Sequence, residues 1–287
     1  MPKLSDIYEA GIKQKQAGVD PATSASVNQI EQKLFQRLMQ QYPQMVAEYA
    51  GLQGTEGGKV LNTDIARELS DDYRADRTKA SDVHEPASKF IKQLFAQKLA
   101  QGDGGDVLFT AGGAGAGKST ALEAMKDHPA VQNAGVVYDT NMAKLDTSRE
   151  KIEEALKANK KATVLYTYRD PLDAFVNGAL QRASKMEKEL GTGRTVPLTE
   201  FLKTHVGALE TIKHLDRIYK DNGKVQIRAV DNSRGKGKAK AIKISQLPTI
   251  DSAKVKKELE NALEREYAAG RISKAIYLGT KGVSKPI

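Results

Sequence analysis

The sequence feature that most limits the fold of this chain is a glycine-rich segment near its middle. Residues 112–119 read Gly-Gly-Ala-Gly-Ala-Gly-Lys-Ser, which fits the Gly-x-x-x-x-Gly-Lys-Ser/Thr pattern of a phosphate-binding loop. The apolar run Val107-Leu108-Phe109 stands just before the segment, and the helix-forming residues 121–125 stand just after it. A flexible glycine-rich linker would need neither flank. The pattern therefore predicts a strand, a phosphate-binding loop and a helix, and with them a site for a nucleoside triphosphate.

The residues of this loop have separate chemical tasks. Glycines allow backbone N–H groups to converge on phosphate oxygens, and the following helix directs its positive end at the same anion. Lys118 supplies a point charge, and the hydroxyl of Ser119 is a ligand for Mg²⁺. We therefore predict ATP and Mg²⁺ as cofactors. The residues predicted to hold them are Gly112, Gly113, Ala114, Gly115, Ala116, Gly117, Lys118, Ser119 and Thr120.

Composition limits the other classes of protein. The 287 residues carry no apolar run long enough to cross a bilayer, and residues 1–6 lack the apolar core of a secretory signal. We therefore expect no membrane association, and the predicted use of a nucleotide suggests a cytoplasmic site of action. The chain has no cysteine, which excludes disulfides and thiolate metal sites, and its four histidines lack the spacing of metal ligands.

The net charge of +9 comes from the C-terminal part of the chain. Residues 201–287 hold 19 Lys and Arg against 9 Asp and Glu, whereas residues 1–200 hold 26 against 27. A contact with nucleic acid and a solvated basic hairpin are the two interpretations. The shortage of aromatic residues that could stack on bases favours the hairpin. The basic cluster consists of Arg234, Lys236, Lys238, Lys240 and Lys243.

Hydropathy patterns divide the chain into three predicted regions. Apolar residues recur every three or four positions over 26–49, which predicts an amphipathic helix with a capping box at Ser26 and Gln29. A shorter helical pattern occupies residues 4–17. The predicted regions are a helical accessory region at 1–56, a phosphate-loop core at 57–250, and a C-terminal helix and tail at 251–287.

Short β-type runs alternate with helical patterns in the core region. Thr147 and Glu150 form a capping box for one helix, and Asp170-Pro171 begins another. This alternation predicts an α/β fold, namely a P-loop kinase-like parallel sheet of about five strands with helices on both faces. The predicted strands are 59–62, 106–110, 135–138, 162–168 and 225–230.

Two aspartates follow predicted strands, where α/β sheets present their ligands. Asp139 ends the run 135–138 and is suited to orienting Mg²⁺ together with Ser119, or to binding substrate. Alternatively, it caps the next turn through residues 140–141. Asp64 also follows a predicted strand, but it could equally be the N-cap of a helix over 65–69.

Two arginines lie in the segment after the fourth predicted strand. On a regular helix with 100° per residue, Arg182 falls beside Phe175 on the flank of an apolar stripe and does not point squarely to solvent. From there it can keep its head in water or reach a phosphate site. Arg194 lies in the loop 191–197, where two glycines provide hinge freedom and a proline ends the loop. This pattern is typical of a lid that carries a cation.

The order of these motifs resembles the zeta toxin family of ATP-dependent kinases. Characterised members phosphorylate UDP-N-acetylglucosamine or related UDP-sugars and so block cell-wall synthesis. The phosphate loop corresponds directly, and the two lid arginines of the family fall on Arg182 and Arg194. Asp64 with Arg67, followed by His84-Glu85-Pro86-Ala87-Ser88, looks like the acidic strand and the Glu-Ala-Ser stretch of the family. The resemblance covers roughly residues 59–233.

The order of segments departs from the usual family pattern. The acidic strand normally follows the phosphate loop, whereas here the similar segment precedes it, so the chain looks permuted. The resemblance then implies that Asp64 is the general base and that Arg67, Asp139 and Thr140 bind substrate. Asp139, twenty-one residues after the loop lysine, is the rival base. His84 belongs to this segment by resemblance, although a packed or N-capping histidine explains it as well.

The sequence thus predicts an ATP-dependent phosphotransferase. Lys118, Arg182 and Arg194 would hold the γ-phosphate, and Asp64 would deprotonate the accepting hydroxyl. The acceptor is a small nucleotide-type substrate, with UDP-N-acetylglucosamine as the family's example, and the resemblance implies a possible antitoxin partner. Two alternatives stay open, a polynucleotide kinase or nucleic-acid-dependent NTPase and a nucleotide-switched binding module.

Overall fold

The computed structural model describes residues 21–102, 104–234 and 238–282, with the backbone alone for 21–28. The chain forms two compact units, Met1–Gln97 and Lys98–Ile287, and each is described here by itself. The region boundaries predicted after residues 56 and 250 stay predictions. The helix predicted for residues 4–17 lies outside the described residues.

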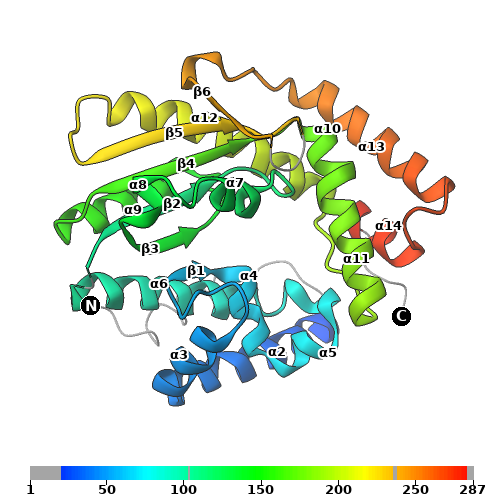
Figure 1. Ribbon diagram of the computed structural model, residues 1–287. Helices are drawn as coiled ribbons and strands as arrows, with labels where there is room; N and C mark the ends of the chain where they lie inside the picture. The colour runs from blue at the N-terminus through cyan, green and yellow to red at the C-terminus, as the bar shows by residue number, and fades with distance from the viewer. Residues whose placement is uncertain (1–20, 103, 235–237, 283–287) are drawn as a thin grey trace. The chain divides into compact units, whose positions relative to one another are not determined.

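The first unit is mainly helical and contains one short strand (Figure 1). Its strand is the predicted one, and the turn of helix that follows it carries Asp64. Its elements are α2 (Pro21–Gln40), α3 (Tyr42–Gly51), β1 (Val60–Asn62), α4 (Thr63–Ala66), η1 (Arg67–Leu69), α5 (Asp71–Ala75), η2 (Arg77–Ala80) and α6 (His84–Gln101), whose last turn passes the boundary between the units.

The single helix predicted over 26–49 is wrong, because the chain breaks between α2 and α3 at Gln41. Pro43 stands in the first turn of α3, where the missing N–H of proline costs no hydrogen bond. Within a continuous helix the same proline would remove a hydrogen bond and clash with the preceding turn. The capping box at Ser26 is also wrong, since α2 already begins at Pro21.

Tyr49 connects helix α3 to strand β1 inside the first unit. Its hydroxyl donates to the carbonyl of Val60 at 3.0 Å and accepts from the N–H of Asn62 at 2.8 Å. Its ring packs edge-on against Phe90 of α6, with centroids 5.6 Å apart. The side chain is fully buried, so these two hydrogen bonds satisfy a polar atom in an apolar core.

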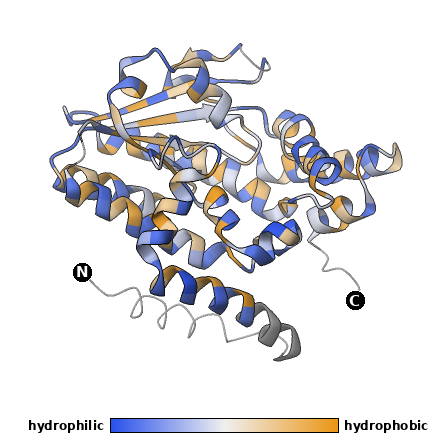
Figure 2. Ribbon diagram, turned by 60° about the horizontal axis from the view of Figure 1, so that its bottom comes forward, coloured by the Kyte–Doolittle hydropathy of each residue, from blue (hydrophilic) through white to orange (hydrophobic). Residues whose placement is uncertain are grey.

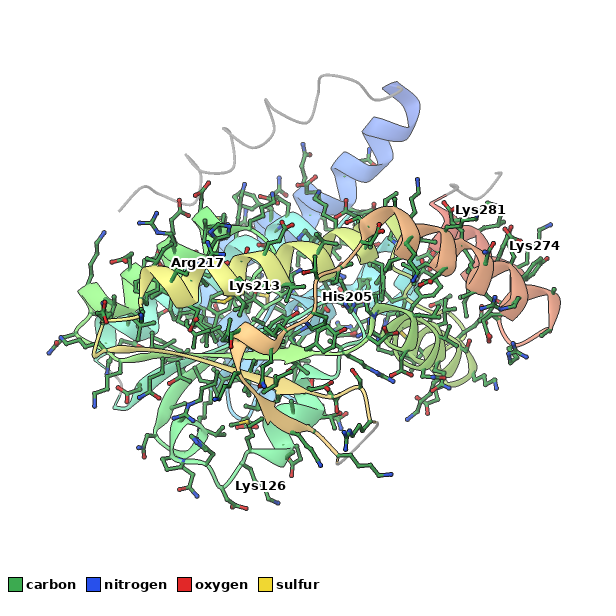
Figure 3. The ribbon with its side chains drawn as sticks, turned by 90° about the horizontal axis from the view of Figure 1, so that it is seen from above. Lys126, His205, Lys213, Arg217, Lys274 and Lys281 are labelled. Atoms are coloured by element: carbon green, nitrogen blue, oxygen red, sulfur yellow. The ribbon has the colours of Figure 1, made fainter. Side chains whose placement is uncertain are left out.

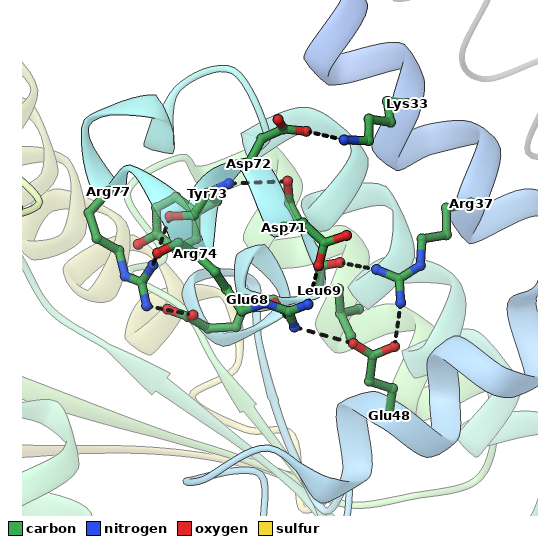
Figure 4. Close-up of polar contacts among 11 residues, drawn as sticks. Lys33, Arg37, Glu48, Glu68, Leu69, Asp71, Asp72, Tyr73, Arg74 and Arg77 are labelled. Atoms are coloured by element: carbon green, nitrogen blue, oxygen red, sulfur yellow. Dashed lines mark hydrogen bonds and ion pairs between the residues drawn. The ribbon is translucent and has the colours of Figure 1, made fainter. Parts of the chain in front are cut away.

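Ion pairs on the outside of the first unit fix the angle of α2 (Figure 4). Leu34 and Leu38 bury the apolar side of this helix. Its polar side contacts residues of η1 and α5, and it also contacts one side chain of α3, Glu48. Exposed pairs of this kind contribute little energy each, but together they give α2 one orientation. The contacts are Lys33 with Asp72 at 2.9 Å, and Arg37 with Glu48 and with the carbonyl of Leu69, both at 2.7 Å.

The second unit is built on a mostly parallel sheet. Its strands lie in the order β3-β2-β4-β5-β6, in which β2 to β5 are parallel and β6 pairs antiparallel with β5. The predicted α/β fold of P-loop kinase type is confirmed. The strands are β2 (Asp106–Ala111), β3 (Ala134–Asp139), β4 (Ala162–Tyr168), β5 (Val225–Asp231) and β6 (Lys240–Ile242).

The helices of the second unit connect these strands and continue beyond them. Hydrophobic and hydrophilic residues alternate along the helices, as amphipathic elements require (Figure 2). The helices are α7 (Lys118–Ala124), α8 (Pro129–Gln132), α9 (Leu145–Lys157), α10 (Pro171–Ala174), η3 (Phe175–Leu180), α11 (Gln181–Leu190), α12 (Leu198–Ile218), η4 (Ile244–Gln246), α13 (Ser252–Ala268) and α14 (Lys274–Lys281).

The strand order places these helices on the two faces of the sheet. The crossover from β2 to β3 runs toward one edge, whereas the crossovers from β3 to β4 and from β4 to β5 run toward the other. Because parallel crossovers are right-handed, α7 lies on one face and α9 and α12 lie on the opposite face. The contact between α9 and α12 agrees with this assignment. The direction of winding changes at β2, which is where such sheets bind ligands.

Two details of the sequence prediction need correction in this unit. Helix α9 begins at Leu145, so Thr147 lies inside the first turn, where its hydroxyl donates to the carbonyl of Lys144 at 3.3 Å. Strand β6 was not predicted, because three residues with an exposed lysine give no hydrophobic signal and depend on β5 for their hydrogen bonds.

A second hydrophobic cluster forms where the helices after β4 meet α12 and α13. Phe175 and Phe201 pack edge-on with centroids 5.1 Å apart, and both are fully buried. Leu259 and Leu263 of α13 close the cluster from the C-terminal side. This core gives η3 and α11, which carries Arg182, a firm support.

The cap of helix α4 gives a first test of the fold. Asn62 accepts hydrogen bonds from the N–H groups of Asp64 and Ile65 at 2.6 and 3.3 Å. Asn62→Ala should lower the free energy of unfolding by about 1 kcal/mol in urea titrations followed by circular dichroism. Asn62→Ser, which keeps a capping oxygen, is the control. Equal losses in both variants would contradict this assignment of the cap.

Candidate functional site

The phosphate loop joins β2 to α7 and lies closely against its neighbours. Gly112 has φ of +138° and Gly115 has φ of +72°, values that side chains rarely allow. A Cβ atom at Gly112 would lie 2.6 Å from the carbonyl oxygen of Thr167, and one at Gly115 would lie 2.3 Å from that of Ala174. Both positions therefore require glycine for conformation and for space.

Three side chains from three different elements hold consecutive carbonyl groups of the loop. His205 of α12 contacts the oxygen of Ala114 through Nε2 at 2.8 Å. Arg169, just after β4, donates to the oxygen of Gly115 at 3.0 Å. Asn232, just after β5, donates to the oxygen of Ala116 at 2.9 Å. These anchors fix the peptide planes of the loop before any ligand binds.

The anchored carbonyls determine where the N–H groups of the loop point. Within one peptide unit the C=O and N–H groups are antiparallel, so the N–H groups of Gly115 and Gly117 turn away from His205 and Asn232. In the described part of the chain these two groups donate to no protein acceptor. Converging N–H groups of this kind form an anion-binding concavity. This donor set fits the phosphates of a nucleotide.

Lys118 and Ser119 begin helix α7 beside this concavity. The ammonium of Lys118 donates to the carbonyl oxygen of Gly112 at 3.4 Å, so it folds back over the loop. Ser119 is exposed in the first turn of the helix, where its hydroxyl is accessible to a metal ion. Lys126, near the end of the same segment, points outward and pairs with Glu123 at the surface (Figure 3).

Asp139 lies next to the phosphate loop across the strand pair β2 and β3. It stands in register with Thr110, and the hydroxyl of Thr110 donates to its carboxylate. In the turn that follows, Thr140 accepts from the N–H of Met142 at 3.5 Å, and Asn141 accepts from that of Ala143 at 3.1 Å. The two interpretations of Asp139, as a site residue and as a cap of this turn, stay predictions.

Asp64 and Arg67 lie together in the first unit. The N-cap of α4 is Asn62, so the interpretation of Asp64 as that cap is wrong. The guanidinium of Arg67 lies 3.2 Å from the Asp64 carboxylate and 2.7 Å from Nδ1 of His84. Because a guanidinium only donates, Nδ1 of His84 is the acceptor. The structure thus brings together the three residues that the resemblance had joined, with the Asp64 side chain 47% exposed.

Arg182 and Arg194 follow each other along the segment after β4. Arg182 is exposed, and the prediction that it sits on the flank of the apolar stripe is wrong. The cause is η3, a π-helical turn that takes up one residue more than an α turn and shifts later residues by roughly 100°. Arg194 is half-buried in a loop that packs on α11, where Gly193 approaches the backbone of Ala183.

The three anchors of the loop were not predicted from the sequence. Arg169 and Asn232 each follow a parallel strand directly, and that position was a usable signal. His205 sits four residues after Phe201 on the buried side of α12, where a histidine normally belongs to the core. Its partner is 91 residues away, which no local pattern could indicate.

His205 is neutral in the folded protein. Burial lowers its pKa from 6.5 to about 4, outweighing the hydrogen bond to the Ala114 carbonyl, and the nearby positive charge of Lys118 acts in the same direction. Because a carbonyl only accepts, Nε2 carries the hydrogen. The ring also packs on Phe201, with centroids 4.5 Å apart. The anchor of Ala114 is therefore a neutral donor in an apolar setting.

The comparison with protein families agrees with this geometry. A family model described as Zeta toxin matches residues 127–239. Over this segment the chain is similar to the zeta toxin family. The segment includes Asp139, Arg182 and Arg194, and it begins after the phosphate loop. This match and the P-loop kinase-like fold together suggest a kinase-like protein. No curated protein matches the chain.

Within the described ranges, no helix combines the length and the apolar character that a membrane span requires.

The pH dependence of stability tests the state of His205. Between pH 6.5 and 4 the unfolded chain binds a proton on this residue and the folded chain does not, so stability falls as the pH falls. Relative to His205→Gln, whose amide can still donate, the wild type should lose about 1 kcal/mol per pH unit in this window. The two proteins should run parallel above pH 6.5. Parallel curves below that pH would show that the ring titrates normally.

Proposed function

We propose that this protein is an ATP-dependent kinase of zeta toxin type, which transfers the γ-phosphate to a hydroxyl of a small nucleotide-type substrate. UDP-N-acetylglucosamine or a related nucleotide is the first candidate. The observation that carries this proposal is the phosphate loop, whose carbonyls are held from outside by His205, Arg169 and Asn232. A loop shaped in this way has its N–H groups arranged for phosphate oxygens before binding.

The charged groups of the second unit take roles that phosphoryl transfer requires. Lys118, Arg182 and Arg194 would offset the negative charge that develops on the transferred group. Ser119 and Asp139 would hold Mg²⁺, which would neutralise part of the negative charge of the phosphates. The contact of Asp139 with Thr110 keeps its carboxylate beside the loop.

The base is a carboxylate, and the chain offers two. By resemblance Asp64 accepts the proton of the substrate hydroxyl, while Arg67, Asp139 and Thr140 bind the substrate. The contacts in the first unit support the assignment of Asp64, because Arg67 orients its carboxylate and His84 in turn orients Arg67. A positioned carboxylate within reach of a hydroxyl is what general-base catalysis needs. The permuted order of the segments is part of this proposal.

A toxin of this kind needs a partner that restrains it. The family resemblance suggests a separate antitoxin, and α2 is a poor substitute for one. Leu34 and Leu38 of α2 are buried in the core of the first unit, and Lys33 and Arg37 pair with neighbouring elements. Helix α2 is therefore better explained as part of the scaffold.

Removal of the loop lysine tests the proposal. Lys118→Ala should lower phosphotransfer from γ-labelled ATP to components of a bacterial metabolite extract by at least about 100-fold. Lys126→Ala, which removes an exposed lysine paired with Glu123, is the matched control and should be unaffected. Mass spectrometry of the labelled product identifies the acceptor. A label found on nucleic-acid ends would favour a polynucleotide kinase, and nucleotide binding without any product would favour a switch.

Isosteric amides separate the two carboxylates. Asp64→Asn should abolish transfer to the acceptor while leaving the affinity for Mg·ATP within about threefold of the wild type, because a base acts on the acceptor. Asp139→Asn should lower the affinity for Mg²⁺ and the affinity for the nucleotide. If the effects are exchanged, Asp139 is the base and the assignment of Asp64 is wrong.

A further inference from the structure

A π-helical turn lies between the phosphate loop and the proposed lid arginine. η3 (Phe175–Leu180) follows α10 and leads directly into α11, so Arg182 stands two residues after its end. Turns of this kind are rare, they insert a residue into a helix, and they occur frequently at functional sites. The insertion explains why Arg182 is exposed although a regular helix would place it elsewhere.

The backbone of the π turn lies directly against the backbone of the phosphate loop. A Cβ atom at Gly178 would lie 2.6 Å from the carbonyl oxygen of Gly115, and one at Gly115 would lie 2.9 Å from the nitrogen of Ala179. Two glycines therefore face each other with no room for a side chain on either. Any displacement of Gly115 must displace the turn, because packed backbones do not compress.

A chain of polar side chains makes the same connection. Arg169 donates from one nitrogen to the carbonyl of Gly115 at 3.0 Å and from Nε to Asp173 at 2.6 Å. The other carboxylate oxygen of Asp173 accepts from Asn177 of the π turn at 2.7 Å, and Asn177 accepts from Gln181 at 3.3 Å. The chain thus begins at the loop and ends at the residue before Arg182.

The central member of this chain is a charged carboxylate. Burial by itself raises the pKa of Asp173, but hydrogen bonds from Arg169 and Asn177 outweigh it and leave the pKa below its ordinary value. Asp170 caps helix α10 by accepting from the N–H of Asp173 at 3.0 Å. Charge-assisted bonds of this type are short and directional, so they transmit position.

We infer that the π turn Phe175–Leu180 couples the phosphate loop to Arg182, with Arg169 and Asp173 as positioning residues and with the facing Gly115 and Gly178 as the second contact. This inference rests on the proposed function, because Arg182 is the proposed cation. The two connections tie Gly115 to the turn of α11 from which Arg182 extends, so a triphosphate held by the loop and the side chain of Arg182 keep one relative position. Without the extra residue, Arg182 would rotate by roughly 100° around the helix axis.

A double-mutant cycle tests the coupling. In the metabolite-extract assay, Asp173→Asn should lower kcat about tenfold and change the KM for ATP by less than about threefold, because it misplaces a group that acts on the transition state. In the Arg182→Ala background the same change should cost less than about twofold more. If the loss of kcat in the double variant equals the product of the losses in the two single variants, the coupling is overturned.

Two controls accompany the cycle. Glu189→Gln removes an i,i+4 ion pair with Lys185 on the exposed side of the same helix, and it should leave kcat unchanged. Asp173→Glu, which keeps the charge, should recover part of the lost kcat. If Arg182→Ala alone leaves phosphotransfer unchanged, the proposed role of Arg182 fails, and this outcome is distinct from failure of the coupling.

Hydrogen exchange tests the coupling without the acceptor. Addition of Mg²⁺ and a non-hydrolysable ATP analogue should slow amide exchange in residues 112–120 and also in residues 175–182. Asp173→Asn should keep the first effect and weaken the second, whereas Glu189→Gln, which removes only the exposed ion pair with Lys185, should keep both. Protection of the loop without protection of the π turn in the wild type would overturn the coupling and leave nucleotide binding intact.

Discussion

The functional arrangement of the second unit depends on the way the carbonyl groups of the phosphate loop are held. His205, Arg169 and Asn232 come from α12, from the end of β4 and from the end of β5, and each occupies one carbonyl oxygen. A glycine-rich loop without these partners could adopt many conformations, at a high entropic cost for ordering. The surrounding fold bears this cost in advance, so a phosphate meets donors that already point at it.

This dependence explains why elements far from the loop matter for its shape. The cluster around Phe175 and Phe201 positions α12 and the start of the π turn, and Leu259 of α13 completes it. The neutral state of His205 belongs to the same arrangement. A charged ring would place a second cation next to Lys118 in an apolar setting, whereas the neutral ring donates a hydrogen bond without that electrostatic repulsion.

The parts of the fold that depend on local pattern could be predicted from the sequence, and the parts that depend on distant contacts could not. The strand before the loop and the helix after it follow from the motif itself. The break before Tyr42 was also readable, from Pro43. In contrast, the direction of Arg182 depends on a π turn that forms against Gly115, and the role of His205 depends on a carbonyl 91 residues away. Asp64 was ambiguous because an aspartate after a strand can be a site residue or a helix cap, and the cap is in fact Asn62, two residues earlier.

The small strand β6 has a consequence for the behaviour of the protein in concentrated solution. It covers the outer side of β5 with three residues, of which Lys240 is exposed. A longer and more apolar strand at this edge would offer a row of unpaired backbone groups to another chain. A short strand that carries lysine ends the ladder and opposes the addition of further strands. The basic C-terminal region therefore helps to keep separate copies of the chain from joining through their sheets.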